Sequence, residues 1–417
     1  MLQRYEIVSI HANINQTFFH LCEKWGAMTQ IRCHCCGIYE KKYYLCRQYN
    51  QRTEMIERII LQNFKSIRHA DIRLGNLNVL IGSNGVGKSN FISFFELVNA
   101  LLNQRLGIHI LERGGIERFL FQGLKHSDHI GSLIDFNNKN AFFFKLKPAI
   151  GNKAFIETSG DYFNGNGDES KDYQNQWHRT VWDNAVEESG ILNSPTWRAE
   201  YLRNFLRSFT VYHFHDTSVT SSMRRECMIG DNEFFRHDAS NLAAFLYRLQ
   251  QNEPQCFKLI EGVIRSIAPY FNHFKLRENP NNKGMISLEW EEKDSDAYLD
   301  ANSFSDGTLR FIALTTLLMQ PNLPDTIIID EPELGLHPSA INKFAALVHR
   351  AAQSKQVILA TQSVNLVNCF EPEDIIVVDR KDNQTVFNRC SKDALEAWLE
   401  DYNIGDIWEK NIIGGQP

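Results

Sequence analysis

Eight residues from Gly82 to Ser89, GSNGVGKS, place glycines, a lysine and a hydroxyl at a spacing suited to holding phosphate groups. Gly85 and Gly87 leave backbone N–H groups uncovered, and a helix that begins here would aim further N–H groups at an anion. Lys88 can reach the β- and γ-phosphates, and Ser89 can ligate magnesium. The pattern predicts a loop that binds ATP and Mg²⁺ through Gly82, Ser83, Asn84, Gly85, Val86, Gly87, Lys88, Ser89 and Asn90.

The residues on either side of this loop predict the elements that would position it. Asn78–Ile81 is a short apolar run that suits a buried strand. Beyond Lys88, apolar residues recur at helical spacing, at Phe91, Phe94, Phe95, Val98, Leu101 and Leu102. The order of strand, glycine loop and amphipathic helix favours a phosphate loop over the simpler alternative, a glycine turn in front of a helix.

Two adjacent acids, Asp330 and Glu331, follow the unbroken β-branched run Ile327–Ile329. Such a run is typical of a central parallel strand covered on both faces, and ligands of open α/β sheets bind at the carboxyl ends of strands. Asp330 can hold magnesium through water, and Glu331 can orient or deprotonate an attacking water. The alternative is a pair of solvated acids at a strand end, which the phosphate loop upstream disfavours.

A third segment, Ser303–Arg310, reads SFSDGTLR and precedes a helical pattern. Ser305, Asp306 and Gly307 lie at the predicted helix start, where a hydroxyl and N–H groups can meet an anion. In isolation this segment would be interpreted as a helix cap.

Composition narrows the class of protein. The 417 residues are 43% hydrophobic and 23% charged, as in a globular protein with a sizeable core. A formal net charge of -6 and a pI near 6.2 give no support to nucleic-acid binding by a strongly basic surface, although they are compatible with a local patch. No apolar run approaches the ~20 residues of a membrane span, and no cleavable signal pattern is present. We therefore expect a cytoplasmic protein without a membrane partner.

The N-terminal residues 1–54 have a different character. Cys33, Cys35, Cys36 and Cys46 cluster there with His34, and Cys33 and Cys36 have a C-x-x-C spacing that could bind zinc. A second well-spaced pair is missing. Because Met55 directly precedes the first strand-like run, we interpret residues 1–54 as an appendage of uncertain status, such as a leader translated from an upstream start.

The remaining pattern mixes strands and helices. Strand-like runs occur at Ile56–Phe64, Ala70–Leu74, Gly131–Phe136, Ala141–Leu146, Lys153–Thr158, Phe209–Phe214, Met285–Trp290 and Gln356–Ala360. Ser159–Gln176 is polar and rich in glycine and asparagine, which predicts an exposed loop. Asn241–Ala268 has helical periodicity but no sustained heptad seam. Trp177, Trp182 and Trp197 could form a base-stacking or partner-binding surface, or could pack within a lobe, which is the commoner case.

These motifs, in this order, resemble ABC-type ATPase heads of the recombination and chromosome-maintenance lineage. The resemblance is carried by IERIILQNFKSIRHADIRLGNLNVLIGSNGVGKSNF, SFSDGT, IIIDE and TQS, and it covers nearly all of Met55–Asp379. The SDGT form, the run DEPELGLHP and the closing WEKNIIGGQP are similar to the predicted-ATPase group related to overcoming-lysogenization-defect and other phage-defence ATPases. The resemblance implies an α/β P-loop NTPase of the ABC-ATPase head type, with an antiparallel β-rich subdomain and an inserted, mostly helical lobe.

The resemblance also divides the chain. The expected parts are the appendage 1–54, the first part of the head 55–158, the inserted lobe 159–284, the second part of the head 285–379 and a C-terminal tail 380–417. The tail has too few residues for a nuclease domain, so we expect any effector to be a separate protein.

Further site residues are implied by the family. Two heads of this family sandwich two ATP molecules, so Ser305, Asp306 and Gly307 would act on nucleotide held by the partner's Lys88. Asp306 replaces the first glycine of the usual LSGGQ, and its negative charge favours Ser305 and Gly307 as the phosphate contacts.

Two glutamines stand at positions with family roles. Gln122, in GGIERFLFQG, corresponds to a glutamine that contacts magnesium and the attacking water. Gln362 stands where a histidine usually senses the γ-phosphate, and its amide can donate a hydrogen bond but cannot carry a positive charge.

The function predicted from this resemblance is a slow ATPase that forms a homodimer around ATP. The dimer would act as a switch for a separate effector, such as a nuclease or toxin in phage defence. A DNA-repair or chromosome-associated clamp that binds DNA directly is the alternative. A small-molecule kinase is disfavoured, because such kinases lack the SFSDGT segment.

Overall fold

The computed structural model describes residues 55–136, 139–164, 177–206, 209–295 and 297–416. The residues from Thr53 to Pro417 form one compact unit. The cysteine cluster of Cys33, Cys35, Cys36 and Cys46, and with it the zinc hypothesis, lies outside the described residues. No helix of the described part is long and apolar enough to cross a membrane.

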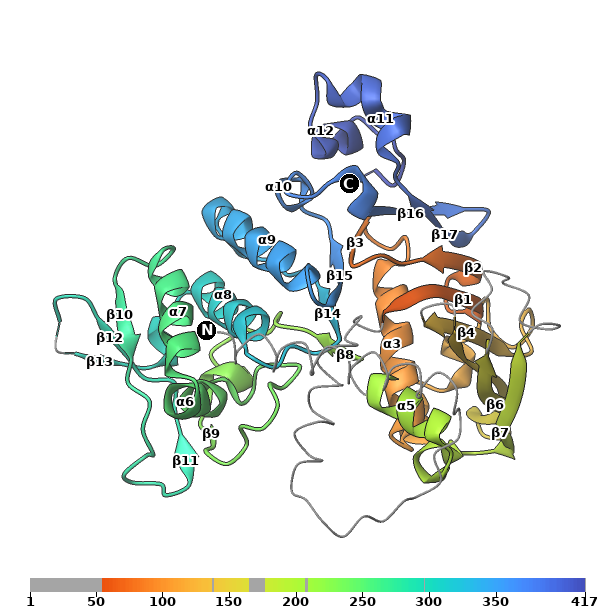
Figure 1. Ribbon diagram of the computed structural model, residues 1–417, viewed down its shortest axis with the longest axis horizontal. Coiled ribbons are helices and arrows are strands. Elements are labelled where there is room, and N and C mark those ends of the chain that lie inside the picture. Colours follow the sequence, from red (N-terminus) through yellow and green to blue (C-terminus); the bar gives the residue numbers. More distant parts are fainter. Residues whose placement is uncertain (1–54, 137–138, 165–176, 207–208, 296, 417) are drawn as a thin grey trace, which may run out of the picture. The chain divides into compact units, whose positions relative to one another are not determined.

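An antiparallel sheet is the first element of the fold. Its order is β2-β1-β4-β5-β6-β7, and β1 pairs with β2 on one side and β4 on the other. The strands are β1 Ile56–Phe64, β2 Ile67–Arg73, β4 Ile130–Phe136, β5 Asn140–Ala149, β6 Lys153–Phe163 and β7 His178–Val186. This sheet confirms the predicted antiparallel β-rich subdomain, seen on the right of Figure 1.

The prediction of a loop from residue 159 onward was wrong for residues 159–163, which belong to β6. Ser159 and Asp161 are buried there, and Ser159 donates a hydrogen bond to the carboxylate of Asp183 on β7. Polar residues can occupy a buried strand when their side chains find partners, and hydropathy does not reveal such partners. β6 therefore runs across the boundary between residues 158 and 159 that we predicted between the head and the inserted lobe.

The second sheet is mainly parallel and carries the motifs. Its order is β17-β16-β3-β15-β14-β8, in which β17 alone is antiparallel to its neighbour. The strands are β3 Leu77–Ile81, β8 Thr210–Tyr212, β14 Thr326–Asp330, β15 Gln356–Thr361, β16 Ile375–Lys381 and β17 Gln384–Arg389. β3, β14 and β15 are buried along their whole length, which explains their continuous apolar runs.

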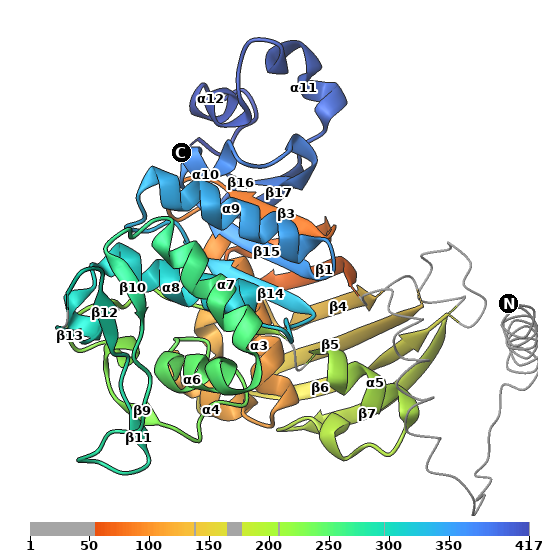
Figure 2. The same ribbon diagram turned by 60° about the vertical axis from the view of Figure 1, so that its left-hand side comes forward.

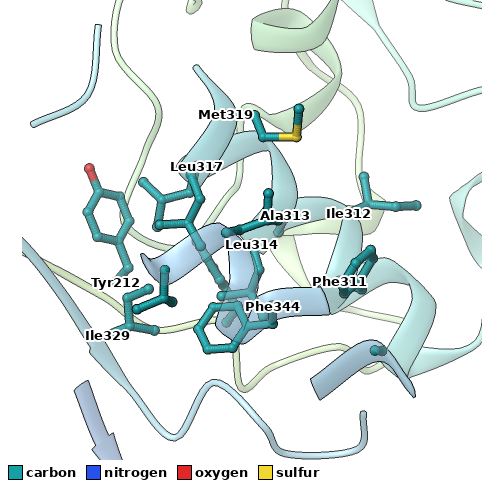
Figure 3. Close-up of a cluster of buried hydrophobic side chains, with 14 of the residues drawn as sticks. Tyr212, Phe311, Ile312, Ala313, Leu314, Leu317, Met319, Ile329 and Phe344 are labelled. Carbon is teal, nitrogen blue, oxygen red and sulfur yellow. The ribbon is translucent and has the colours of Figure 1, made fainter. Parts of the chain in front are cut away.

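Helices cover both faces of this sheet. Val79, Ile329 and Leu359 face one side with the apolar residues of α8 (Asp306–Met319) and α9 (Pro338–Ala352). Leu80, Ile328 and Ile358 face the other side with those of α3 (Lys88–Leu102). The alternation follows from the two-residue period of a strand. Figure 2 shows α8 and α9 beside β14 and β15, and Figure 3 shows the core that α8 forms with Tyr212, Ile329 and Phe344.

Helices and short strands between β8 and α8 form a further layer against α8. The helices are α6 Leu242–Asn252 and α7 Pro254–Arg265, and the strands are β9 Cys227–Met228, β10 Phe271–Phe274, β11 Met285–Ile286, β12 Trp290–Glu292 and β13 Tyr298–Leu299. The predicted strand Met285–Trp290 is two strands, because β11 pairs with β9 whereas β12 pairs with β10 and β13. A strand that changes partner cannot be recognised from periodicity.

The remaining α-helices are α4 Leu106–Glu112, α5 Trp197–Leu206, α10 Val364–Val367, α11 Lys392–Leu399 and α12 Ile404–Glu409. α4 and α5 pack with α3 in one hydrophobic core. Two of the three tryptophans pack within the protein, since Trp177 is buried and Trp182 stacks on Phe142. Trp197 is 62% exposed, and a binding role for it stays a prediction.

The C-terminal residues pack against the parallel sheet. The predicted boundary between head and tail, between residues 379 and 380, lies inside β16, and β17 continues the same sheet. The predicted tail therefore begins within a sheet strand. Trp408 of α12 is fully buried and its indole N–H donates to the carbonyl of Gly415 at 2.6 Å. A Cβ on Gly415 would lie 2.7 Å from Val377 Cγ1, 3.0 Å from Val378 O and 3.6 Å from the Cα of Gly82, so the tail lies against β16 and close to the first residue of the phosphate loop.

Candidate functional site

The phosphate loop joins β3 to α3, as the sequence predicts. Gly85 and Gly87 have φ of 79° and 120°, which side chains rarely adopt, and a Cβ on Gly87 would clash with the hydroxyl of Thr385. α3 begins after Gly87 without a side-chain cap and without an acid in its first turn. Its N-terminal N–H groups therefore suit an anion.

Lys88 is buried within this loop, with 5% of its surface exposed. Its ammonium donates to the carbonyl oxygens of Gly82 at 2.5 Å and Ser83 at 3.0 Å. Burial lowers the pKa of Lys88, and the negative charges of Glu331, Asp330 and Glu333 oppose that effect. The structure thus brings the loop lysine and three carboxylates of a distant segment into one electrostatic site.

Asp330 ends β14 and is 7% exposed. Its Oδ1 is buried and lacks a hydrogen bond among the described residues. Burial raises the pKa of Asp330, whereas the charges of His213 and His215 lower it. The imidazole Nε2 of His215 also donates to the backbone carbonyl of Asp330 at 2.8 Å, so this histidine fixes the strand end.

Glu331 follows in a left-handed backbone conformation with φ of 44°. Its N–H donates to the carbonyl of Ala360 on β15 at 2.8 Å, which holds the strained residue in place. The amide Nε2 of Gln362 donates to Glu331 Oε1 at 2.6 Å. The two predicted catalytic residues at the ends of β14 and β15 are therefore hydrogen-bonded to each other.

Glu333 is a site residue that sequence reasoning missed. Its Oε1 accepts hydrogen bonds from the Thr361 hydroxyl at 2.6 Å and from the Gln362 N–H at 3.0 Å, while Oε2 is buried without a partner among the described residues. Burial raises the pKa of Glu333. Glu333, the third acid of DEPE, was visible in the sequence, but nothing there indicated that it would bind the backbone at the end of β15.

Ser305 caps α8 in this structure. Its hydroxyl accepts the N–H of Thr308 at 3.2 Å and lies 2.8 Å from the Thr308 hydroxyl. A Cβ on Gly307 would clash with the carbonyl of Gly335, so glycine is required where α8 meets the loop after Glu333. No contact between described residues joins Ser305, Asp306 or Gly307 to Lys88 of the same chain.

Arg310 and His215 connect α8 to the carboxylates. The buried Arg310 guanidinium donates to the carbonyls of Phe214 at 2.7 Å and His215 at 2.9 Å, and His215 in turn bonds Asp330. Burial lowers the pKa of Arg310, while Asp306 and Glu333 oppose this effect. Two of the predicted segments are therefore tied together within one copy of the chain.

Gln122 lies apart from these carboxylates. It has a left-handed φ of 54° and lines a cavity of about 1070 Å³ that also reaches Asn90 of α3. Basic residues of this cavity include Lys65, Arg113, Arg118 and Arg380. No contact between described residues joins Gln122 to Asp330 or Glu331, so its role stays a prediction.

The residues present fit a hydrated magnesium ion held partly by nucleotide. No group of three or more histidine, cysteine or acidic residues among the described residues could enclose a metal. Mg²⁺ usually takes one or two protein ligands and completes its shell with water and phosphate oxygens. The carboxylate of Asp330, with its buried Oδ1 that has no hydrogen bond among the described residues, has the chemistry of such a ligand.

Residues 77–368 match the protein-family model described as "AAA domain, putative AbiEii toxin, Type IV TA system". The chain belongs to this AAA-domain family. The matched range contains the phosphate loop, Ser303–Arg310, Asp330, Glu331 and Gln362.

A nuclease of a phage is similar to this chain in sequence. The Old nuclease of Escherichia phage P2 is 22% identical over 374 residues, which are 82% of this chain and 62% of that protein. The chain thus spans less than two thirds of the relative's length. The resemblance to the overcoming-lysogenization-defect group is confirmed.

Solved structures show the same fold. An Smc head bound to the C-terminal winged-helix domain of ScpA has a TM-score of 0.53 and 16% identity, covering 82% of this chain and 99% of that one. An Smc head with an extended coiled coil, bound to the C-terminal domain of ScpA from Pyrococcus furiosus, has a TM-score of 0.52 and 14% identity over 84% and 99%. The predicted ABC-type ATPase head fold is therefore confirmed for this AAA-domain protein.

Proposed function

We propose that this AAA-domain protein hydrolyses ATP slowly and that ATP joins two copies into a dimer that switches a separate effector, a nuclease or toxin of bacterial phage defence. The observation that carries the ATPase part is the cluster of Lys88, Asp330, Glu331 and Gln362 around the phosphate loop. The family description and the phage P2 relative, whose name is that of a nuclease, support the defence setting.

Each part of the cluster has a task in this proposal. Lys88 exchanges its bonds to the Gly82 and Ser83 carbonyls for phosphate oxygens, which are stronger acceptors because they are charged. Glu331, oriented by Gln362, accepts a proton from the attacking water. Mg²⁺, held by Ser89 and Asp330, would neutralise phosphate charge when bound.

We call Ser303–Arg310 the signature segment from here on. The proposed dimer gives this segment a role at the nucleotide of the partner. In this proposal its Ser305, Asp306 and Gly307 contact the nucleotide that is bound to the phosphate loop of the partner. Gln122 would reach the nucleotide from the neighbouring cavity.

The first test compares wild type, Lys88→Ala and Glu331→Gln by light scattering with and without ATP and Mg²⁺. We expect ATP to double the mass of wild type transiently and of Glu331→Gln persistently, and to leave Lys88→Ala unchanged. A constant mass of Glu331→Gln with bound ATP would contradict the dimer, and phosphate release by Glu331→Gln at the wild-type rate would contradict the assignment of the base.

A second test separates the switch from the alternative DNA clamp. Filter binding with a salt titration should show no ATP-stimulated DNA retention, because the net charge of -6 offers little basic surface. ATP-stimulated retention with a steep salt dependence would favour the clamp.

A further inference from the structure

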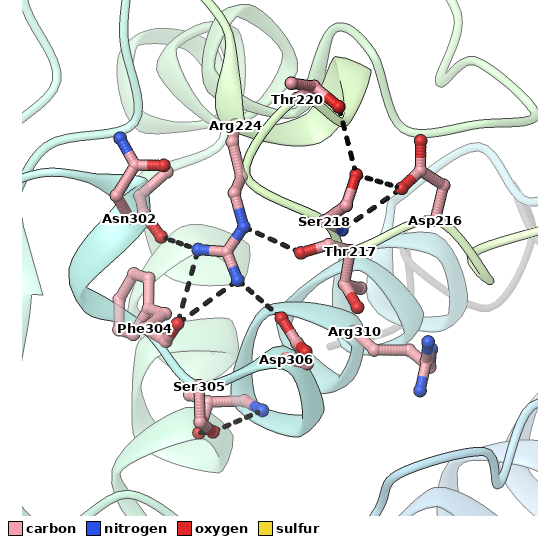
Figure 4. A network of polar contacts seen from close by, with 12 residues as sticks. Asp216, Thr217, Ser218, Thr220, Arg224, Asn302, Phe304, Ser305, Asp306 and Arg310 are labelled. Atoms are coloured by element: carbon pink, nitrogen blue, oxygen red, sulfur yellow. Dashed lines mark hydrogen bonds and ion pairs between the residues drawn. The ribbon is translucent and has the colours of Figure 1, made fainter.

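Arg224 lies at the centre of a hydrogen-bond network around the signature segment (Figure 4). All five N–H donor positions of its guanidinium have acceptors. Nε donates to Thr217 O at 2.8 Å, Nη1 to the carbonyls of Ala301 and Phe304, and Nη2 to Phe304 O at 3.3 Å and Asp306 Oδ1 at 2.7 Å. One side chain thus fixes the residues before α8 and the first residue of the helix.

Burial differs sharply between the two charged partners. The Arg224 side chain is 5% exposed, whereas the Asp306 side chain is 65% exposed. The carboxylate therefore faces outward with the guanidinium directly behind it. A buried guanidinium that loses its carboxylate would keep its carbonyl acceptors, but an exposed Asp306 without Arg224 would lose its ion-pair partner.

The position of Asp306 makes this ion pair relevant to phosphate binding. Asp306 occupies the first turn of α8, where backbone N–H groups and the helix dipole attract anions. An acid at this position therefore competes with a phosphate for the positive charge of the helix N-terminus. Arg310, four residues later, is a second buried guanidinium near Asp306: burial lowers its pKa, and the charges of Asp306 and Glu333 oppose that effect. The inner side of the signature segment is therefore positive.

We propose that Arg224 is the built-in counter-ion of Asp306, a positioning residue that allows an aspartate to stand in the signature segment while that segment meets the partner's nucleotide. This inference rests on the proposed function. It predicts that removal of Arg224 harms pairing through the exposed charge of Asp306, and that removal of that charge restores pairing.

The test measures ATP-dependent pairing in the Glu331→Gln background by light scattering over a series of protein concentrations. Arg224→Met should weaken pairing by at least about tenfold, the equivalent of roughly 1.4 kcal/mol. The double variant Arg224→Met with Asp306→Gly should recover most of that loss. High salt should also reduce the defect of Arg224→Met, because it screens the repulsion between Asp306 and phosphate.

Three controls keep the outcome clear. Fluorescent-nucleotide binding to the unpaired chain should be the same in all variants, since Lys88 is intact. Arg248→Met removes an arginine that also holds two carbonyls, those of Asn232 and Glu233, and it should pair like the parent. Arg224→Lys retains the charge but not the five donors of the guanidinium, so it should pair less well than the parent and clearly better than Arg224→Met.

The results that would overturn the inference are distinct from those that concern the function. If the Glu331→Gln parent does not pair, the proposed function fails and the inference fails with it. If the parent pairs but Arg224→Met pairs equally well, or if Asp306→Gly gives no recovery, the counter-ion role is wrong while the dimer stands. A loss in Arg224→Lys as large as in Arg224→Met would also contradict it.

Discussion

The side-chain amide of Gln362 donates a hydrogen bond of 2.6 Å to the carboxylate of Glu331. The contact joins the ends of the adjacent parallel strands β14 and β15. The donor is uncharged, so the orientation of Glu331 depends on an amide that does not titrate.

Replacement of Gln362 should therefore affect catalysis more than binding. A hydrogen bond to a charged group contributes about 1.5–3 kcal/mol, so we expect Gln362→Ala to lower kcat by roughly tenfold to a hundredfold at a similar KM. Gln362→His should retain more activity and add a dependence on pH near neutrality. Steady-state phosphate release from pH 6 to about 8.5 checks both. An unchanged kcat in Gln362→Ala would show that the contact does not orient the base.

Glu333 offers a prediction about stability and pH. Burial raises the pKa of Glu333, so its charged form is disfavoured in the folded chain relative to the unfolded one. The resulting destabilisation is absent below the unfolded pKa, near 4.3, and develops as pH rises through the folded value. Glu333→Gln should thus raise the melting temperature of nucleotide-free protein at pH 7, and the gain should shrink towards pH 4. The exposed Glu400→Gln is the control, and a gain independent of pH would contradict the assignment.

Complementation tests the assignment of the signature segment to the partner's pocket. A mixture of Ser305→Arg and Lys88→Ala chains can form heterodimers in which one pocket has an intact loop and an intact signature segment. With random pairing of equal amounts, about a quarter of wild-type activity should return. Ser305 also caps α8, so each variant needs a melting curve to show that it folds. Mixed, folded chains that remain inactive would argue against shared pockets.

Gly307 gives a prediction based on shape alone. A Cβ there would clash with the Gly335 carbonyl, so Gly307→Ala should displace the loop after Glu333 and destabilise the fold by about 1–3 kcal/mol. The matched control is Gly262→Ala in α7, where a Cβ meets nothing within 4 Å and alanine should stabilise the helix by about 0.5–1 kcal/mol. Denaturant titration measures both. Equal stability of the two variants would show that the loop adapts to the methyl group.

The sequence predicted those parts of the fold that depend on local pattern. The strand before Gly82, the helix after Lys88 and the buried run before Asp330 each follow from spacing and polarity, and the structure contains them. That these three elements meet at one site could be predicted only from the family resemblance, because no residue pattern shows which strands are neighbours. The roles assigned to Gln122 and to the signature residues stay predictions.

The contacts that could not be predicted connect residues far apart in the chain. Arg224 lies 82 residues before Asp306, and Glu333 meets Gln362 across adjacent strands. Nothing about an arginine in a serine-rich stretch indicates that its five donors will all be used. The end of β6 was missed for a similar reason, since Ser159 is polar and its partner Asp183 belongs to the next strand.

Gly415 lies close to Gly82, which places the last residues of the described chain beside the phosphate loop. Trp408 holds Gly415 there by donating a hydrogen bond to its carbonyl. If the loop changes shape when phosphate binds, it has to move against these residues. We therefore expect strain at the C-terminal helices to alter nucleotide affinity without a change to any residue of the loop itself.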